Sequence, residues 1–354
     1  MDLSLSDEQE QLVETFQAFF AKECPPTVVR ASEETGGFDR ELWDAFGALG
    51  GPTMGVDAAA GGGGATMLDL VLVAEQFGAV LAPIPLVEGL AAGRLLATGG
   101  AAVRPACDHL AEAPPSVATV ALHPAHDGTA RLVPAGAVAT VVVGLDDDEL
   151  VVVETEPPTL TSAHNLGDGP IADRSLRSGT RTVTSHTVIA RGADAIERHD
   201  QAVDEWRVLM AGALVGLAGA ALAIGVEYAK QRHQFGVPIG SFQSIAHGLA
   251  DVATTVDGAQ LLVREAAWAA DEAEADATAL ARMAFLFAAR SAQQTTATAL
   301  HVHGGYGFTL EYDIQLYHRR AKAWPLLLGD PRRGALHLAD ALFGPVDHSA
   351  TEAR

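Results

Sequence analysis

Cysteine is scarce in this chain, and its scarcity excludes two kinds of architecture. Only Cys24 and Cys107 occur among 354 residues, and no CxxC pair or Cys/His cluster is present. A disulfide framework needs several spaced cysteines, and a structural zinc site needs a cluster of Cys or His ligands. We therefore expect two reduced thiols, as in a cytoplasmic protein, and no metal site.

Basic residues are also few. Lysine and arginine total 23 against 45 aspartates and glutamates, which gives a formal net charge of −22 at pH 7. A field of that sign repels nucleic-acid phosphates and anionic lipid. Nucleic acid and membrane surfaces are therefore not expected as partners, and an anionic ligand would need a local arginine or lysine.

The start of the chain lacks a signal-peptide pattern, which would be a basic segment followed by an apolar one. The sequence opens instead with the acidic, polar MDLSLSDEQEQ. One later stretch, 208–226, carries no charge and is long enough to span a bilayer. It is rich in alanine and glycine and continues into polar helical sequence at Glu227. We therefore expect the buried central helix of a cytoplasmic protein rather than a membrane span.

Residues 1–98 have the pattern of an N-terminal helical domain. Ser6 and Gln9 form the signature of a capping box, and apolar residues follow at helical spacing. Further helices are expected over 38–49, 66–77 and 86–96, and the glycines at 61–64 predict a loop.

Residues 99–200 change character and predict a small middle β domain. Turn residues and acidic clusters separate short β-branched runs at 117–121, 139–143, 150–153 and 182–184. No glycine-rich fingerprint for a dinucleotide joins a strand to a helix here, so a Rossmann fold is not expected.

Residues 201–354 predict a C-terminal four-helix bundle. A long helix is expected from about Asp204 to Arg232, and glycine and proline follow its end. Ser241 is expected to cap a second helix, 276–302 forms a third, and Asp330-Pro331 opens a short final helix. The expected fold class is α+β: a helical domain, a reduced β domain and a helical bundle, in chain order.

The first segment with recognisable chemistry is RHQFGVPIGSFQ at 232–243. Arg232 offers a planar fork of donors that suits phosphate. The ring of Phe235 can lie against a heterocycle, and Gln243 can bond to ring edges. The same pattern also fits a solvated arginine that complements the helix dipole, so these residues by themselves leave both interpretations open.

The second segment is HVHGGYGF at 301–308. Gly304 and Gly305 expose backbone N–H groups, and such a nest can hold an anion. A double glycine is also an ordinary end of a helix. Taken alone, this segment leaves both interpretations open as well.

Together the two segments are more specific. RHQFGVPIGSFQSIAHGLAD and HVHGGYGFTLEYDIQLYHRRAKA strongly resemble the C-terminal helical domain of the acyl-CoA dehydrogenase family. LSDEQ, LWDAFGALG and VLVAEQFGAVLAPIPL resemble that family's first helical domain. The resemblance implies a helix–sheet–helix architecture, FAD as hydride acceptor, an acyl-CoA thioester as substrate and electron-transfer flavoprotein as the electron acceptor.

The resemblance also assigns roles residue by residue. Arg232 matches the arginine that binds the FAD pyrophosphate across a subunit interface. Phe235 matches the aromatic residue beside it, and Gln243 matches the glutamine that follows. The other positions implied to contact FAD of a neighbouring subunit are His301, where the family usually has glutamine, and the glycine pair Gly304 and Gly305.

The sequence departs from the family at the catalytic base. Removal of the thioester α-proton needs a base, such as a carboxylate whose pKa is raised in an apolar pocket. Leu328 stands where the family commonly has this glutamate, and Trp206 occupies the alternative position. Asp330 and Glu205 are nearby carboxylates, but a helix cap and a solvated charge are their simpler roles. The middle domain also has no threonine–glutamate–proline segment followed by GSD and no tryptophan–isoleucine–threonine strand, the segments that normally cover the flavin in this family.

These departures resemble one subset of the family, the shorter, base-lacking subunits of actinobacterial heteromeric steroid side-chain acyl-CoA dehydrogenases. That resemblance implies a full-length partner subunit that supplies the glutamate, an α2β2 assembly, and a steroid side-chain CoA thioester as substrate. Two alternatives remain open. One is a self-sufficient homo-oligomer that uses Asp330 or Glu205 as its base, and the other is a structural subunit without cofactor.

Overall fold

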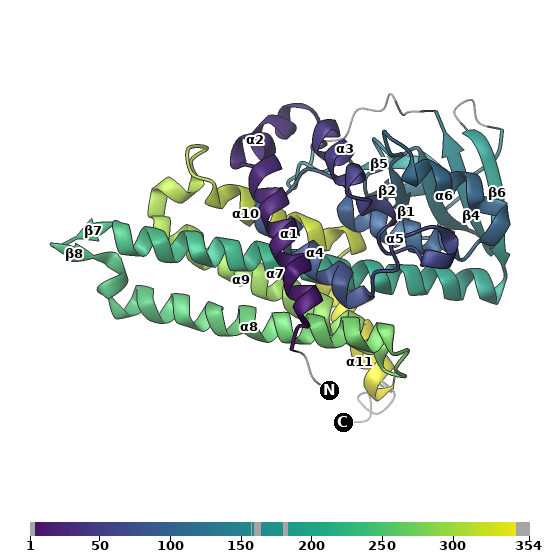
Figure 1. Ribbon diagram of the computed structural model, residues 1–354. Coiled ribbons are helices and arrows are strands. Elements are labelled where there is room, and N and C mark those ends of the chain that lie inside the picture. The colour runs from purple at the N-terminus through teal and green to yellow at the C-terminus, as the bar shows by residue number, and fades with distance from the viewer. Residues whose placement is uncertain (1–3, 157, 159–163, 180–182, 345–354) are drawn as a thin grey trace.

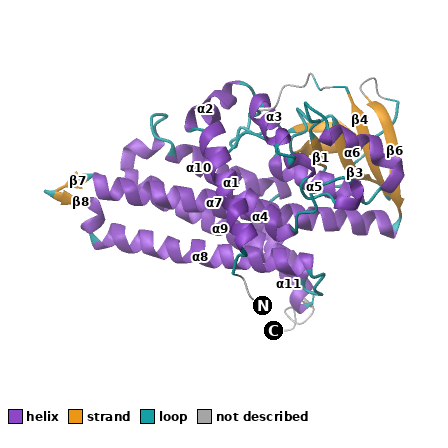
Figure 2. Cartoon of the chain, viewed as in Figure 1, coloured by secondary structure: helices purple, strands orange, loops and turns teal. Residues whose placement is uncertain are grey.

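The structure is a computed structural model and describes residues 4–156, 158, 164–179 and 183–344. Helices make up most of the molecule (Figure 2). The main sheet lies at one end, and a small two-stranded hairpin projects at the other (Figure 1). Helices, sheet and helices follow one another along the chain, as the sequence predicts.

The N-terminal part is helical. The predicted capping box is confirmed: the backbone N–H of Gln9 donates to Ser6 Oγ at 3.2 Å, and that of Ser6 donates to Gln9 Oε1 at 3.1 Å. Three further predicted helices are present, whereas α2 and α6 were not predicted. The helices are α1 (Asp7–Glu23), α2 (Pro26–Glu34), α3 (Arg40–Ala48), α4 (Met67–Val80), α5 (Leu86–Ala97) and α6 (Arg104–Ala111).

The main sheet has four strands in the order β1–β3–β4–β6. β1 runs parallel to β3, and the other neighbours are antiparallel. A separate antiparallel pair consists of β2 and β5. The predicted run at 182–184 lies partly outside the described residues, and Val183 opens β6. The strands are β1 (Ala118–Val120), β2 (Thr129–Val133), β3 (Val141–Asp146), β4 (Glu149–Thr155), β5 (Ala172–Ser175) and β6 (Val183–Arg191).

The C-terminal part is a helical bundle in which α7, α8 and α9 run side by side (Figure 1). A hairpin of β7 (His233–Gln234) and β8 (Val237–Pro238) connects α7 to α8. The helices are α7 (Ala193–Gln231), α8 (Gln243–Asp271), α9 (Ala277–His303), α10 (Ile314–Ala323) and α11 (Pro331–Phe343).

Two predicted boundaries in the bundle are wrong. α7 begins at Ala193 rather than at about Asp204, because the helix starts directly after β6 with no side-chain cap to mark it. Ser241 does not cap α8. Its hydroxyl donates instead to the backbone carbonyl of Pro238 at 2.7 Å, and α8 begins at Gln243.

α7 forms the centre of the molecule. By length and composition it could cross a membrane, but 67% of its most apolar window is buried inside the fold. Small residues let its neighbours approach closely. A Cβ on Gly78 of α4 would come within 1.8 Å of the carbonyl oxygen of Ala213 on α7. The predicted buried central helix is therefore present.

Candidate functional site

The two segments with recognisable chemistry lie at the same end of the bundle. α7 ends and α8 begins there, and α9 reaches this end before the short 3-10 helix η5 (Gly304–Phe308) (Figure 1). The rings of Tyr228 on α7 and His303 on α9 stack, with centroids 4.0 Å apart and planes inclined by 25°. This contact fixes the end of α7 against the end of α9. We call this region, residues 232–243 and 301–308, the bundle end.

The hairpin tip is a two-residue turn. Phe235 and Gly236 have φ of +54° and +84°, as in a type I′ turn. A bulky residue at positive φ is strained, and such strain often marks a functional position. The Phe235 side chain is 93% exposed and meets Phe242 edge to face, with ring centroids 6.2 Å apart. Its ring is therefore available to another molecule.

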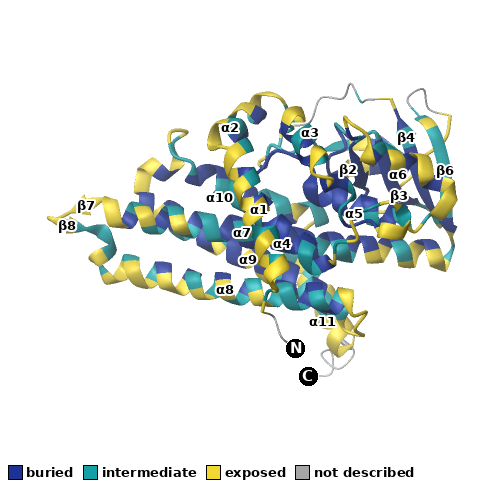
Figure 3. Ribbon diagram, viewed as in Figure 1, coloured by how far each residue is buried: buried dark blue, intermediate teal, exposed yellow. Residues whose placement is uncertain are grey.

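Arg232 and Gln243 flank this hairpin. The backbone N–H of Arg232 donates to Tyr228 at 2.9 Å, and its carbonyl accepts from Ile239 at 2.8 Å. Its side chain is exposed, and no carboxylate pairs with it in the described part of the chain. Gln243, the first residue of α8, is exposed too. Arg232 and Gln243 are thus exposed at the same end of the bundle as Phe235, where Figure 3 colours the hairpin of β7 and β8 largely as exposed.

The glycine pair follows α9. His301, Gly304 and Gly305 are all exposed, and Gly304 has φ +61°. A Cβ built on Gly304 or Gly305 would meet no atom within 4 Å. At Gly307, by contrast, a Cβ would lie 2.7 Å from the carbonyl oxygen of Leu300. Packing within this chain therefore requires a glycine at 307 but not at 305.

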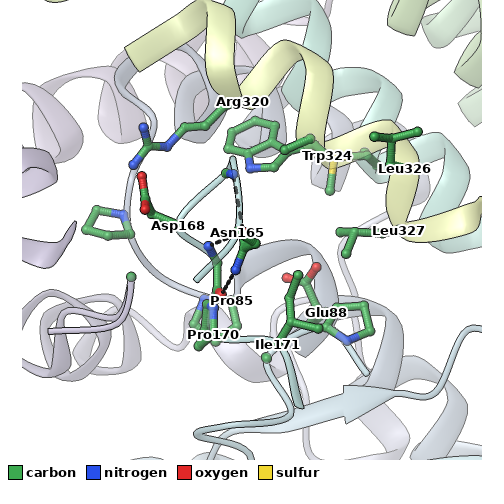
Figure 4. A pocket seen from close by; sticks show the side chains of 18 of the residues that line it. Pro85, Glu88, Asn165, Asp168, Pro170, Ile171, Arg320, Trp324, Leu326 and Leu327 are labelled. Atoms are coloured by element: carbon green, nitrogen blue, oxygen red, sulfur yellow. Dashed lines mark hydrogen bonds between the residues drawn. The ribbon is translucent and has the colours of Figure 1, made fainter. Parts of the chain in front are cut away.

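The chain also has a cavity of about 400 Å³. Figure 4 shows Trp324 and Leu327, from the turn after α10, facing Pro85 and Ile171 across it. None of the six predicted FAD residues lines this cavity. The bundle end and the cavity are therefore separate features of the described structure.

Glu88 of α5 is a cavity residue that sequence reasoning missed. Its carboxyl group is buried, and Figure 4 shows it beside Ile171 and Pro170. The indole N–H of Trp206, which is itself fully buried, donates to Glu88 Oε1 at 3.4 Å. Burial raises the pKa of Glu88 because desolvation disfavours the charged form. The available signal was a lone glutamate within the apolar run 84–92, since a helix that is apolar on all sides is buried.

The two weaker candidates for a base occupy other positions. Asp330 is exposed and caps α11, accepting the backbone N–H of Arg332 at 3.0 Å. Glu205 forms a two-pronged ion pair with Arg94, at 2.9 and 3.1 Å. Neither residue lines the cavity. Asp330 is the helix cap that its sequence context predicts. The expected solvated charge at Glu205 is wrong, because α7 begins earlier than predicted and the Glu205 side chain is 13% exposed in its ion pair with Arg94.

The order of helical, sheet and helical parts is that of the acyl-CoA dehydrogenase fold. The family models for the N-terminal and C-terminal acyl-CoA dehydrogenase domains match residues 6–104 and 196–340. The chain belongs to the acyl-CoA dehydrogenase family. Acyl-CoA dehydrogenase IpdE2 of Mycolicibacterium smegmatis is 32% identical over 96% of this chain and 100% of its own length. IpdE2 of Mycobacterium tuberculosis is 30% identical, over 92% of this chain and 94% of its own length.

Solved structures share the fold. A chain of the ChsE4–ChsE5 complex from Mycobacterium tuberculosis has a TM-score of 0.84 at 24% identity, covering 98% of this chain and 100% of that one. A chain of the Tcur3481–Tcur3483 steroid ACAD has a TM-score of 0.81 at 24% identity, with coverage of 99% and 100%. Butyryl-CoA dehydrogenase of Megasphaera elsdenii has a TM-score of 0.83 at 23% identity, with coverage of 97% and 100%.

Members of this family bind FAD, and the residues of the bundle end fit such a group. Arg232 is an exposed cation that could pair with a phosphate, and Phe235 is an exposed ring. The space in front of Gly304 and Gly305 is open, so a ligand could approach their backbone closely. These groups face outward, which suits a cofactor held mainly by a neighbouring subunit.

Proposed function

We propose that this chain is the shorter subunit of a hetero-oligomeric, FAD-dependent acyl-CoA dehydrogenase that acts on a steroid side-chain CoA thioester. In this proposal the chain contributes Arg232, Phe235, Gln243 and the glycine pair to FAD held mainly by a full-length partner subunit. The partner would supply the glutamate that removes the α-proton, and FAD, when bound, would supply the hydride acceptor. The expected assembly is α2β2, and electron-transfer flavoprotein is the expected electron acceptor.

The observation that carries this proposal is the outward position of the bundle end. Every residue assigned to FAD is exposed, and none lines the cavity of this chain. A cofactor touched by these residues would therefore lie against a second subunit. The names of structural relatives favour the same interpretation, since one is a ChsE4–ChsE5 complex and another a steroid ACAD.

The positions of Asp330 and Glu205 favour a base on the partner. Leu328 stands at the family's base position, and Leu326, Leu327 and Gly329 of the same turn line the cavity. Asp330 and Glu205, the bases considered for a self-sufficient enzyme, lie outside the cavity lining and have other partners. Arg232 is exposed and has no ion-pair partner among the described residues. Its retention weighs against a purely structural subunit, because such a role needs no cation there.

The test is co-production with a full-length acyl-CoA dehydrogenase that carries the catalytic glutamate. We expect a stable mixed oligomer that is yellow and reduces an electron acceptor when given a suitable acyl-CoA. Produced alone, this chain is expected to aggregate, self-associate or remain largely free of flavin. A chain that binds FAD fully and turns over substrate by itself would contradict the proposal and favour the self-sufficient enzyme.

A further inference from the structure

The segment 306–313, which includes the end of η5 and leads into α10, exposes apolar side chains beside the bundle end. Phe308 is 75% exposed and Leu310 is 74% exposed. Phe235, in the hairpin at the same end, is exposed as well. Apolar side chains that are exposed together typically mark a contact with another molecule. The function proposed above places a partner subunit at this end, so the conformation of the segment determines which side chains the partner meets.

Tyr312 anchors the segment to the bundle. Its ring meets Tyr228 of α7 and His303 of α9 edge to face, with ring centroids 6.1 and 5.7 Å apart and planes inclined by 82° and 73°. Tyr228 and His303 also stack on each other, so the three rings form one cluster. This cluster fixes the segment at Tyr312. Leu310 does not belong to the cluster, so another contact must set its position.

Arg30 of α2 supplies that contact, although it lies 280 positions away from Leu310 along the chain. Its Nε and Nη2 atoms donate to Asp313 Oδ1 at 3.1 and 2.6 Å, and its Nη1 atom donates to the backbone carbonyl of Leu310. All three nitrogen atoms of the guanidinium group therefore bond to one stretch of four residues. A lysine presents a single nitrogen on a flexible stem and cannot reproduce this planar contact.

Asp313 is diverted from its usual role by this contact. It occupies the N-cap position of α10, where an aspartate usually accepts the N–H of the second or third helical residue. Among the described residues its side chain accepts no such bond, and it pairs with Arg30 instead. The Arg30 and Asp313 side chains are 31% and 37% exposed, and ion pairs this exposed add little to the stability of a whole fold. The geometry therefore indicates a local role, which is to set the position of the segment.

We propose that Arg30 is a positioning residue for the bundle end. From α2 it holds the segment 306–313 in the conformation in which Phe308 and Leu310 project outward, beside the glycine pair, to contact the partner subunit. This inference rests on the proposed function, because the partner subunit holds the FAD that the glycine pair contacts. Without Arg30 the segment opens more often, so the surface that binds the partner subunit and FAD is correctly formed for a smaller fraction of the time.

Hydrogen exchange tests this role in the full chain, in whichever assembly it is purified, and needs no FAD. Arg30→Ala should raise the exchange rate of backbone amides in the segment by about three- to tenfold, because local opening becomes easier. Arg40→Ala is the matched control. Arg40 also bonds to a carboxylate and to a backbone carbonyl, those of Asp44 at 2.8 Å and Pro115 at 3.2 Å, but it lies on α3. Unchanged exchange of the segment in Arg30→Ala would overturn the proposal.

Flavin titration of the chain assembled with its partner tests the consequence for the cofactor. Arg30→Ala should weaken FAD affinity by about three- to tenfold. Arg30→Lys should weaken it less, and Arg40→Ala should leave it unchanged even where it lowers the unfolding temperature as much. An equal loss of FAD affinity in Arg40→Ala would show a general effect of stability and would overturn the proposal.

Arg232→Ala separates this inference from the proposed function. If Arg232→Ala weakens FAD binding and Arg30→Ala does not, Arg30 has no positioning role while the proposed function stands. If neither variant weakens FAD binding, both are wrong.

Discussion

The backbone carbonyl of Glu75 on α4 lies against Gly216 on α7, so closely that a Cβ at position 216 would come within 1.8 Å of the carbonyl oxygen. Both groups belong to the main chain, so no side chain can move aside to make room. The same contact brings Glu75 into the core, where its side chain is 7% exposed. Two predictions concern this helix crossing.

Gly216→Ala is expected to destabilise the fold strongly, because α4 and α7 would have to separate. Overpacking of a core typically costs about 1–3 kcal/mol, and a clash with backbone belongs at or above the upper end of this range. Gly219→Ala is the matched control on the same helix, since a Cβ there would meet nothing within 4 Å. It should stabilise the fold by about 0.5–1 kcal/mol through helix propensity. Thermal unfolding of both variants checks the prediction, and similar behaviour of the two would contradict it.

Glu75 should make the stability of the fold depend on pH. Burial raises its pKa from 4.5 to about 7, opposed by Arg264 at 3.8 Å and by a hydrogen bond from Gln260 at 3.1 Å. The folded state therefore holds a proton that the unfolded state releases between about pH 4.5 and 7. The stability contributed by this proton is fully present below pH 4.5 and is lost as the pH rises through about 7.

Glu75→Gln removes this titration and keeps an oxygen that can accept from Gln260. Compared with the variant, the wild type should lose stability on the order of 3 kcal/mol between pH 4.5 and 7, since each unit of pKa shift corresponds to about 1.4 kcal/mol. Denaturant unfolding at several pH values measures the difference between the two proteins. A difference that stays constant over this range would show that Glu75 is not protonated in the fold.

Arg232→Ala is expected to weaken FAD binding by the assembled enzyme. A charge-assisted hydrogen bond to phosphate contributes about 1.5–3 kcal/mol, which corresponds to about a tenfold or greater loss of affinity. Arg290→Ala is the matched control, because Arg290 is an exposed arginine on α9 outside the bundle end. Flavin titration of both assembled variants gives the comparison. Unchanged FAD affinity in a correctly assembled Arg232→Ala protein would contradict the assignment of Arg232 as an FAD ligand.

Sequence reasoning located the long elements because their ends carry strong local signals. The capping box at Ser6, the glycine and proline after α7 and the Asp330-Pro331 start of α11 are all present. The start of α7 was misplaced because Gly192 precedes it without a side-chain cap. α2 and α10 are short and have no side-chain cap at their start, so their sequences gave little to identify them.

The two candidate sites differ in how far the sequence could reveal them. The bundle end is built from two contiguous segments, and its residues are exposed, so their pattern could be recognised without tertiary structure. The environment of Glu88 depends on Trp206, 118 positions away along the chain. The apolar run 84–92 signals that Glu88 is buried. Its cavity arises from packing between α5, α7 and the turn after α10, and no local pattern contains that information.

Substitutions at Gly305 and Gly307 should distinguish a glycine that contacts FAD from a glycine that packing within this chain requires. Gly305→Val adds its side chain in open space, so we expect normal helix content by circular dichroism but loss of FAD from the assembled enzyme. Gly307→Val adds a Cβ only 2.7 Å from a backbone oxygen and should destabilise the end of α9 itself. If Gly305→Val unfolded the chain instead, Gly304 and Gly305 would be required for the turn after α9 and not for contact with FAD.

The last prediction concerns the catalytic base. Asp330→Asn should preserve the start of α11, because asparagine caps a helix about as well as aspartate. In the assembled enzyme we expect the rate to stay within a few-fold of the wild type, since the Asp330 carboxylate accepts from Arg332 and does not line the cavity. Replacing the partner subunit's catalytic glutamate by glutamine should lower the rate by about 10²–10⁴-fold, the usual contribution of general base catalysis. Steady-state turnover of the two assembled variants distinguishes the outcomes clearly. If Asp330→Asn abolished turnover while FAD content and assembly were unchanged, the base would lie on this chain and the proposed division of labour between the subunits would be wrong.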